Sequence, residues 1–272
     1  MVRPMPDPAL SRSLLPLALK LADAARAAIL PYFRSAAAAN PDNKAKTGYD
    51  PVTEADRAAE RAMREIIFST RTDDGIEGEE YGSAAGKSGL VWHLDPIDGT
   101  RAFVAGLPSW CVLIGLVQDG KPILGVIDQP WLDERYVGLG DESWLDCRGA
   151  RTHLRTRDCP ALAHAVLSTT DPFILTPPER GAFDHLRATA RLTRYGLDAY
   201  AYARLAAGTI DMVAETGLKS HDVAALIPVI EGAGGVVTDW RGSPAKLGGQ
   251  IVASANRKIL DEALISLKRS AL

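Results

Sequence analysis

The fold is decided by the stretch Trp92-His93-Leu94-Asp95-Pro96-Ile97-Asp98-Gly99-Thr100. Its apolar residues predict a buried strand that ends at Asp95, and Pro96 then stiffens a turn. Asp98 and Gly99 expose backbone N–H groups just before a predicted helical turn at 101–105. Two carboxylates three residues apart at a strand end suit a hard divalent cation, which prefers oxygen ligands. Amides at the start of a helix suit an anion, so the stretch predicts a metal ion and a phosphate side by side.

A plainer interpretation of this stretch stays open, because Asp98-Gly99 is a common turn dipeptide and Asp95 fits a cap for that turn. Two other metal or phosphate sites are excluded by spacing. An EF-hand loop needs acidic residues at alternate positions, and here the alternate position is Ile97. The aspartyl-phosphate phosphatases have two Asp residues that lie two apart, not three. The histidines lack the spacings of a zinc hydrolase, and no G-x-S-x-G or P-loop motif occurs.

Acidic residues elsewhere in the chain have both a plain and a functional interpretation. Glu79 and Glu80 lie in a glycine-flanked segment that fits a solvated loop. Asp222 fits the first turn of a helix, where the helix dipole favours an acid. Asp56 fits a T-x-x-D capping box with Thr53, and in the functional interpretation it also forms a hydrogen bond to a hydroxyl near the metal ions. Each of these residues can take part in catalysis only if the fold brings it close to the stretch 92–100.

The composition is that of an ordinary globular protein. The chain has 272 residues, of which 46% are apolar and 24% charged, and its formal net charge is −3. A nucleic-acid binder usually carries a basic excess, so that class is disfavoured. The three cysteines are odd in number and widely spaced, which predicts reduced, structural thiols in a cytoplasmic protein. The apolar run at 14–21 is too short and too interrupted to span a membrane, and it predicts an amphipathic helix.

Apolar periodicity and turn residues predict a mixture of helices and strands. A helix begins near Thr53, and strands follow at 90–94, 111–117, 123–127, 135–137 and 144–148. Further on we expect a strand at 166–169, helices at 179–190 and 199–207, a short apolar segment at 212–214, a helix at 223–233, strands at 236–238 and 251–254, and a helix at 259–267.

These elements predict two α/β layers, each with its own sheet, and a boundary near residue 150. The first half, 1–149, carries most of the predicted metal ligands. The second half, 150–272, carries Asp222 and the predicted specificity residues. Residues 40–52 are expected to form a polar loop, and the segment 36–48 is a candidate for a mobile lid.

Together these residues resemble the inositol monophosphatase-like phosphatases, a magnesium-dependent and lithium-sensitive family. Four motifs occur in the order of that family, and they cover nearly the whole chain. They are D-P-V-T-E-A-D at 50–56, G-E-E at 78–80, D-P-I-D-G-T at 95–100, and H-D-V-A-A at 221–225 followed by E-G-A-G-G at 231–235. Each motif alone is weak, but their co-occurrence at these spacings is highly specific.

The resemblance implies an α/β (α+β) fold, a five-layer αβαβα sandwich, in a protein that forms a homodimer. It also implies a site for two or three Mg²⁺ ions, with Mn²⁺ as a substitute, whose ligands are Glu79, Asp95, Asp98, Asp222 and the main-chain carbonyl of Ile97. Thr100 and Asp56 are expected to orient the attacking water, and Glu79 is counted with them as a catalytic residue. The amides of Gly99 and Thr100 are expected to bind the phosphate.

Within the family, the chain is similar to the histidinol-phosphate phosphatase branch. This similarity rests on the segments 125–130, 198–202, 215–219, 225–228 and 238–240. Inositol phosphatases usually have Trp where this chain has His221. The branch implies hydrolysis of L-histidinol phosphate, in histidine biosynthesis, with Asp198 and Glu215 facing the cationic end of the substrate. Further substrate contacts are expected from Asp98, Gly99, Thr100, Arg101 and Asp222.

Other functions stay open at this point. An inositol monophosphatase or a broad sugar-phosphate phosphatase would use the same metal site. A metal-binding scaffold without catalysis belongs to a different class, but it would be expected to lack Asp56, Thr100 or a metal carboxylate, and all of these are present. For the enzyme we expect a small phosphorylated substrate and neither a nucleic-acid nor a membrane partner.

Overall fold

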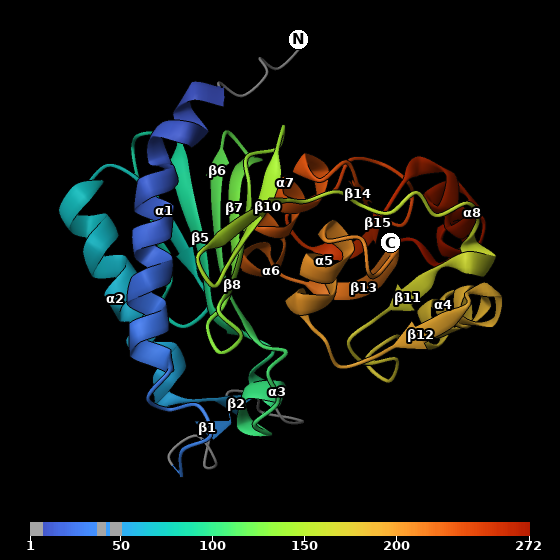
Figure 1. Ribbon diagram of the computed structural model, residues 1–272, viewed down its shortest axis with the longest axis horizontal. Helices are drawn as coiled ribbons and strands as arrows, with labels where there is room; N and C mark the ends of the chain where they lie inside the picture. The colour runs from blue at the N-terminus through green and yellow to red at the C-terminus, as the bar shows by residue number, and fades with distance from the viewer. Residues whose placement is uncertain (1–7, 37–41, 44–50) are drawn as a thin grey trace.

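The first layer of the fold consists of two long helices. The computed structural model describes residues 8–36, 42–43 and 51–272. Helices α1 (Pro8–Ile29) and α2 (Glu54–Thr70) pack against each other and cover one face of a large sheet (Figure 1). Their inner faces bury apolar side chains such as Leu21 and Met63 completely. The burial of these faces against the sheet stabilises both helices.

The sheet under these helices has eight strands within the described residues, in the order β10-β9-β8-β7-β6-β5-β3-β4. Neighbouring strands run antiparallel, except β3 and β5, which are parallel. Their bounds are β3 (Gly75–Gly78), β4 (Gly82–Ala84), β5 (Leu90–Asp98), β6 (Cys111–Gln118), β7 (Lys121–Gln129), β8 (Glu134–Gly138), β9 (Ser143–Cys147) and β10 (Ala150–His153). A separate antiparallel pair joins β1 (Asp42–Asn43) to β2 (Pro51–Val52).

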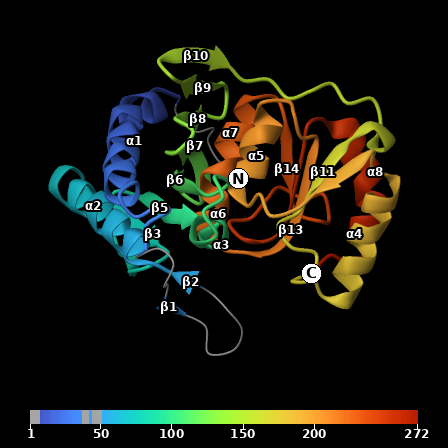
Figure 2. The ribbon, with the colours of Figure 1, turned by 60° about the horizontal axis from the view of Figure 1, so that its bottom comes forward.

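The other face of this sheet packs against helices α6 (Ser220–Ala224) and α7 (Leu226–Gly232), with α5 (Ala199–Ala206) beside them (Figure 2). These helices separate the first sheet from a second one with the order β12-β11-β13-β15-β14. Its strands are β11 (Val166–Ser168), β12 (Leu192–Arg194), β13 (Met212–Leu218), β14 (Val236–Thr238) and β15 (Gly249–Ser254). Helices α4 (Pro177–Thr189) and α8 (Arg257–Leu267) cover its outer face.

The predicted five-layer αβαβα arrangement is therefore confirmed for the described residues (Figure 2). Short elements complete it: α3 (Thr100–Val104) follows β5 directly, and single 3₁₀ turns occur at Leu162–His164 and Lys268–Ser270. β10 joins the first sheet, so that sheet extends past residue 149. The division into two halves at this residue stays a prediction.

Several predictions about local structure were incomplete or wrong. Strands β3, β4, β10 and β12 were not predicted, because they are short and contain few apolar residues. The helix predicted at 223–233 is two helices that meet at Ala225. Pro228 has no N–H to donate to the carbonyl of Ala224, so one continuous helix is disfavoured there. Most of the predicted 40–52 loop and 36–48 lid lies outside the described residues.

The sequence predicted neither a membrane-spanning helix nor a disulfide framework. Among the described helices, none is both long and apolar enough to cross a membrane. The thiols of Cys111, Cys147 and Cys159 are all free, and those of Cys111 and Cys159 are buried. This agrees with the prediction of structural thiols without a disulfide framework.

Close packing between α6, α7 and the first sheet depends on glycine. A Cβ atom on Gly125 of β7 would lie 2.0 Å from the carbonyl oxygen of Ala225, and one on Gly115 of β6 would lie 2.6 Å from the Cβ of Ala224. Any larger residue at either position would push these helices off the sheet. The glycines therefore fix the position of α6, the helix that carries Asp222.

Candidate active site

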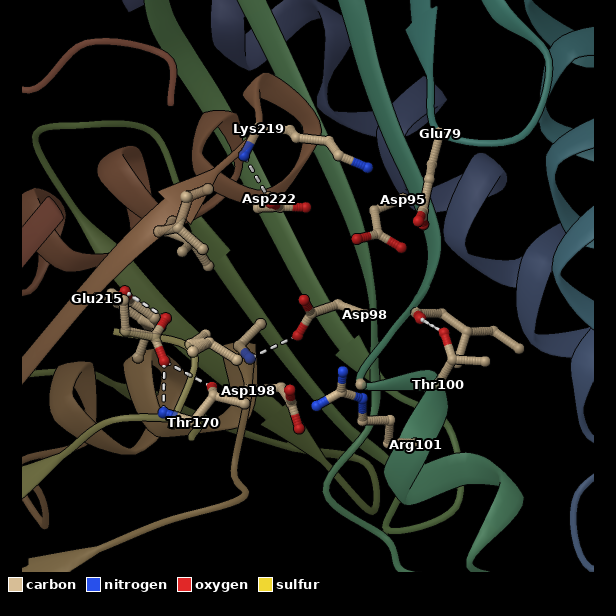
Figure 3. A pocket seen from close by; sticks show the side chains of 18 of the residues that line it. Glu79, Asp95, Asp98, Thr100, Arg101, Thr170, Asp198, Glu215, Lys219 and Asp222 are labelled. Carbon is tan, nitrogen blue, oxygen red and sulfur yellow. Dashed lines mark hydrogen bonds between the residues drawn. The ribbon is translucent and has the colours of Figure 1, made fainter. Parts of the chain in front are cut away.

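A cavity of about 290 Å³ lies where the first sheet meets the second half of the chain. Ten of the predicted site residues line it: Glu79, Asp95, Ile97, Asp98, Gly99, Thr100, Arg101, Asp198, Glu215 and Asp222. Figure 3 shows Asp95, Asp98 and Asp222 directed toward one another near its centre. Asp56 does not line the cavity. The fold thus gathers residues from four separate stretches of sequence around one cavity.

A β-bulge places Asp95 and Asp98 on the same side of β5. On a regular strand, residues three apart point to opposite faces of the sheet. Here Asp95 pairs with Leu113 of β6 and Asp98 pairs with Cys111, so β5 has one extra residue between the two pairs. Bulges of this kind redirect side chains and are common beside active sites. The strand that was predicted to end at Asp95 therefore continues to Asp98, with Pro96 inside the bulge, a position that proline tolerates.

The carboxylates form two overlapping groups that share Asp95. One oxygen from each of Asp95, Asp98 and Asp222 lies within 4.8 Å of the other two. Atoms of Glu79, Asp95 and His221 meet the same limit. Glu79 follows the end of β3, and its backbone N–H donates to the carbonyl of Leu94 at 3.1 Å, which ties it to β5. Residues from β5, α6 and the turn after β3 thus converge on one point.

The electrostatics of this cluster favour a bound cation. Burial, and then the charges of Glu79, Asp98 and Asp222, raise the pKa of Asp95 well above its usual range. Burial and the charges of Asp198 and Asp222 do the same to the pKa of Asp98. Asp95 Oδ1 is buried and has no hydrogen-bond partner among the described residues. Because unpaired buried polar atoms are rare, this all-oxygen cluster fits a hard divalent ion such as Mg²⁺.

The turn after the bulge presents the backbone of Ile97, Gly99 and Thr100 to the cavity. Gly99 has φ = 83°, in the left-handed region that favours glycine, and caps the start of α3. The Thr100 hydroxyl donates to the carbonyl oxygen of Ile97 at 3.0 Å. Amides in the first turn of a helix lack acceptors within the helix. Two roles stay predictions: the carbonyl of Ile97 as a metal ligand, and the amides of Gly99 and Thr100 as the phosphate-binding pair.

Asp56 is completely buried in the first turn of α2. The backbone N–H and the hydroxyl of Thr53 both donate to its Oδ2, at 2.8 and 2.6 Å, which confirms the predicted capping box. Its Oδ1 is buried without a hydrogen-bond partner among the described residues. Burial raises the pKa of Asp56 to about 7, the Thr53 hydrogen bonds oppose the rise, and the charges of Glu80 and Glu79 add to it. Within the described residues, no hydrogen bond joins Asp56 to Thr100, its predicted partner.

Asp198 and Glu215 form the acidic wall of the cavity on the side of the second sheet (Figure 3). Glu215 lies on β13 and is buried, and both of its oxygens are already engaged. Oε1 accepts from the N–H and hydroxyl of Thr170, at 2.7 and 2.5 Å, and Oε2 accepts from the Tyr202 hydroxyl at 2.9 Å. Burial and then the charge of Glu215 raise the pKa of Asp198 to about 7, while the charge of Arg101 opposes this rise.

Arg101, the predicted phosphate contact, lies at the rim of the cavity. Its guanidinium is 3.7 Å from the carboxylate of Asp171, and its side chain is 57% exposed. The exposed position weakens this ion pair through solvent screening. Arg101 is therefore near the site without being fixed in it by this contact.

Sequence patterns gave no role to three residues that complete the site. Thr170 and Tyr202 hold Glu215 in place, and no local signal marks them because their partner is distant in the chain. Lys219 lines the cavity and extends toward the carboxylates (Figure 3). Burial raises the pKa of Asp222, and the charges of His221 and Lys219 oppose that rise.

Comparison with known proteins agrees with this geometry. Residues 11–272 match the inositol monophosphatase family. The chain belongs to this family. It is therefore a phosphatase of a metal-dependent family that acts on small phosphorylated substrates, and the acidic cluster described above is in keeping with that. The predicted resemblance is thereby confirmed.

Three relatives show how close the similarity is. The chain is 42% identical over 264 residues to the bifunctional phosphatase IMPL2 of Arabidopsis thaliana, a chloroplastic protein, covering 91% of this chain and 73% of that one. It is 36% identical over 226 residues to the histidinol-phosphatase of Mycobacterium tuberculosis, covering 82% and 86%. A solved structure of an inositol monophosphatase from Zymomonas mobilis superposes with a TM-score of 0.83 at 40% identity, covering 94% and 98%.

Proposed function

We propose that this protein is a Mg²⁺-dependent histidinol-phosphatase, which hydrolyses L-histidinol phosphate to L-histidinol and phosphate. The observation that carries the proposal is the pair Asp198 and Glu215 on the cavity wall, next to the metal cluster. Each raises the pKa of a neighbouring acid, because Glu215 is buried and Asp198 is half-buried among other carboxylates. A leaving group with an ammonium would neutralise this wall, whereas inositol offers only hydroxyls.

The backbone of Asp198 supports this assignment. Its φ of 47° and ψ of −140° lie in a region that residues other than glycine rarely adopt. Strain of this kind is concentrated at functional sites, where the surrounding structure maintains it. A Cβ atom on Gly99 would lie only 3.1 Å from Asp198 Oδ2, so the carboxylate is directly beside the predicted phosphate-binding turn. In this position, the Asp198 carboxylate would contact the leaving alcohol of a short phosphate ester.

The relatives support the reaction class more strongly than the substrate. Two further relatives with the name histidinol-phosphatase, from Chlorobaculum parvum and Streptomyces coelicolor, are 35% and 34% identical to this chain. The Zymomonas mobilis structure has the name inositol monophosphatase at a similar level of identity. Inositol 1-phosphate, and sugar phosphates more broadly, are therefore the alternative substrates that an assay has to include.

In the proposed mechanism, the side chains of the protein bind and orient, and Mg²⁺, when bound, would supply the positive charge that neutralises the phosphoryl group and acidifies the attacking water. Glu79, Asp95, Asp98, Asp222 and the Ile97 carbonyl would hold the ions. The amides of Gly99 and Thr100 donate to phosphate oxygens at the start of α3. Asp56, whose Oδ1 has no other partner among the described residues, and Thr100 orient the attacking water. Asp198 and Glu215 bind the ammonium of the leaving alcohol. Positioning and charge neutralisation do most of the work in phosphoryl transfer.

The test is a substrate comparison with matched variants. In Mg²⁺, the wild-type protein should release phosphate from L-histidinol phosphate with a higher kcat/KM than from inositol 1-phosphate. Asp198→Asn should reduce that preference by about tenfold or more, which is the effect of losing one charged contact. Asp184→Asn, a change at an exposed position on α4, is the matched control and should change nothing.

The outcome separates the alternatives. An equal or reversed preference in the wild-type protein would leave the phosphatase class intact and remove the histidinol assignment. No phosphate release from any ester, by folded protein with Mg²⁺ or Mn²⁺, would favour the inactive scaffold. A homodimer, a cytoplasmic location and replacement of Mg²⁺ by Mn²⁺ are parts of this proposal that need their own measurements.

A further inference from the structure

The acidic cluster includes one nitrogen donor. His221 lies on α6, next to Asp222, and is only 6% exposed. One of its ring nitrogens, one oxygen of Glu79 and one oxygen of Asp95 lie within 4.8 Å of one another. Ligands of one tetrahedral zinc ion, each about 2.0–2.2 Å from it, lie about 3.3–3.6 Å from one another. The three atoms are therefore close enough to belong to one site, and their side chains would have to move inward to bind a shared ion.

A second observation points to a ligand at the same place. Asp95 is 2% exposed, and its Oδ1 is buried without any hydrogen-bond partner among the described residues. A buried carboxylate oxygen in a folded protein normally has a donor or a metal ion as its partner. The imidazole of His221 does not donate a hydrogen bond to this oxygen, which is therefore available to a metal ion.

The known contact of His221 does not account for its position. Its Nε2 lies 3.5 Å from Asp222 Oδ1, which is longer than a good hydrogen bond. An imidazole that only balanced the charge of Asp222 would be expected to make a shorter, direct contact. The two overlapping groups instead differ in chemistry: Asp95, Asp98 and Asp222 offer only oxygen, whereas Glu79, Asp95 and His221 offer oxygen and nitrogen.

We propose that His221 is a metal ligand, and that Glu79, Asp95 and His221 form a mixed oxygen and nitrogen subsite that binds Zn²⁺ in preference to Mg²⁺. Imidazole suits zinc and other transition metals, whereas carboxylates and carbonyls suit Mg²⁺. The all-oxygen group next to it remains suited to Mg²⁺. The inference rests on the proposed metal cluster and is independent of which phosphate ester is cleaved.

Direct metal binding tests the inference without an activity assay. Chelator-stripped protein is titrated by calorimetry with Zn²⁺ alone and, separately, with Mg²⁺ alone. His221→Asn should weaken Zn²⁺ binding by about tenfold or more, while Mg²⁺ binding should change by less than about threefold. His153→Asn is the matched control, because His153 is exposed on β10, and it should leave both affinities unchanged.

Since His221 is buried, its replacement could impair folding, so a measurement on the wild-type protein accompanies the titration. In ¹⁵N-edited NMR of the histidine rings, Zn²⁺ should shift the resonances of one ring strongly, and that ring should be absent in His221→Asn. No shift of the His221 ring at saturating Zn²⁺ overturns the inference. An equal loss of Zn²⁺ and Mg²⁺ binding in a folded variant overturns it too.

The result can be separated from the proposed function. If zinc binds through His221 but L-histidinol phosphate is not preferred, only the substrate assignment fails. If Mg²⁺-dependent hydrolysis occurs and the His221 ring does not respond to Zn²⁺, only the inference about the mixed subsite fails.

Discussion

Asp98 Oδ2 accepts a hydrogen bond of 2.5 Å from the backbone N–H of Ala199. Asp98 ends β5 of the first sheet, and Ala199 begins α5 in the layer between the sheets. The bond therefore joins a predicted metal ligand directly to the residue that follows Asp198. In the proposed function, Asp98 would bind a cation while this hydrogen bond ties it to the residue after Asp198, so the cation would keep a fixed position relative to the acidic wall.

Replacement of Asp95 should remove activity and relieve electrostatic repulsion at the same time. Asp95 belongs to both carboxylate groups. Asp95→Asn is expected to lower kcat/KM by more than about 100-fold, since even residues behind a metal ligand contribute 10–100-fold. Its pKa in the folded protein is raised well above the usual range, so ionised Asp95 destabilises the metal-free fold. The variant should therefore have the higher Tm in excess chelator, as measured by calorimetry.

Asp184→Asn is the control for this pair of measurements, because it removes an exposed carboxylate far from the cavity. It should leave both kcat/KM and Tm close to the wild-type values. Full activity of Asp95→Asn would show that the metal cluster is wrongly located.

The metal-free protein should lose stability as the pH rises through neutrality. The pKa of Asp198 is raised from 3.8 to about 7. Its contribution to stability is fully present below the unfolded value of 3.8 and is lost progressively as the pH rises from there through about 7. His93 acts in the opposite direction, because burial lowers its pKa from 6.5 to about 4, so its effect makes stability increase with pH between these values. Above pH 6.5 this effect no longer changes. The Tm in chelator should thus fall between pH 6.5 and about 8.

Two comparisons check the origin of this pH effect. Asp198→Asn should reduce the decrease in Tm, because the titrating group is gone. Saturating Mg²⁺ should reduce it as well, since the ion binds the ionised carboxylates and stabilises the folded state. A Tm in chelator that stays constant or rises over this pH range would contradict the electrostatic description of the cavity.

The Thr53 hydroxyl should affect both stability and the pH profile of activity. It donates to Asp56 at 2.6 Å, and this hydrogen bond opposes the rise in the pKa of Asp56. Thr53→Val should lower the free energy of unfolding by about 0.5–2 kcal/mol through loss of the cap. It should also move the acidic limb of the pH–rate profile to higher pH, because Asp56 then ionises less readily. Thr53→Ser, which keeps the hydroxyl, should restore the wild-type limb.

The glycine contacts under α6 should connect packing to metal binding. Gly125→Ala would place a Cβ 2.0 Å from the Ala225 carbonyl oxygen. It should destabilise the protein by about 1–3 kcal/mol and weaken Mg²⁺ binding, because α6 and Asp222 are displaced. Gly181→Ala is the matched control: no atom lies within 4 Å of its Cβ, and it is inside α4. It should stabilise the protein by about 0.5–1 kcal/mol in chemical denaturation. Unchanged Mg²⁺ binding in a destabilised Gly125→Ala would contradict the link.

Local patterns in the sequence were sufficient for those parts of the fold and site that depend on neighbouring residues. The capping box at Thr53 and the central acidic stretch at 95–100 belong to this class. The bulge between Asp95 and Asp98 could not be predicted, because it depends on pairing with β6. That Glu79 and Asp222 meet there followed only from the family resemblance, since β3 and α6 are distant in the chain.

The contacts of Asp198 and Glu215 could not be predicted from the local sequence either. The sequence marked Glu215, but its partners Thr170 and Tyr202 come from other elements that only the folded chain brings together. The strained backbone of Asp198 is likewise maintained by tertiary contacts, such as the one between Asp98 and the following residue, Ala199.

The most direct test of the central claim is a crystal structure of the protein with Mn²⁺ and phosphate, measured at a wavelength where manganese scatters anomalously. We expect an anomalous peak bounded by Asp95, Asp98 and Asp222, with a phosphate between that peak and the amides of Gly99 and Thr100. No anomalous peak there at full Mn²⁺ loading, with these three carboxylates turned away from one another, would contradict the proposed metal site and the chemistry derived from it.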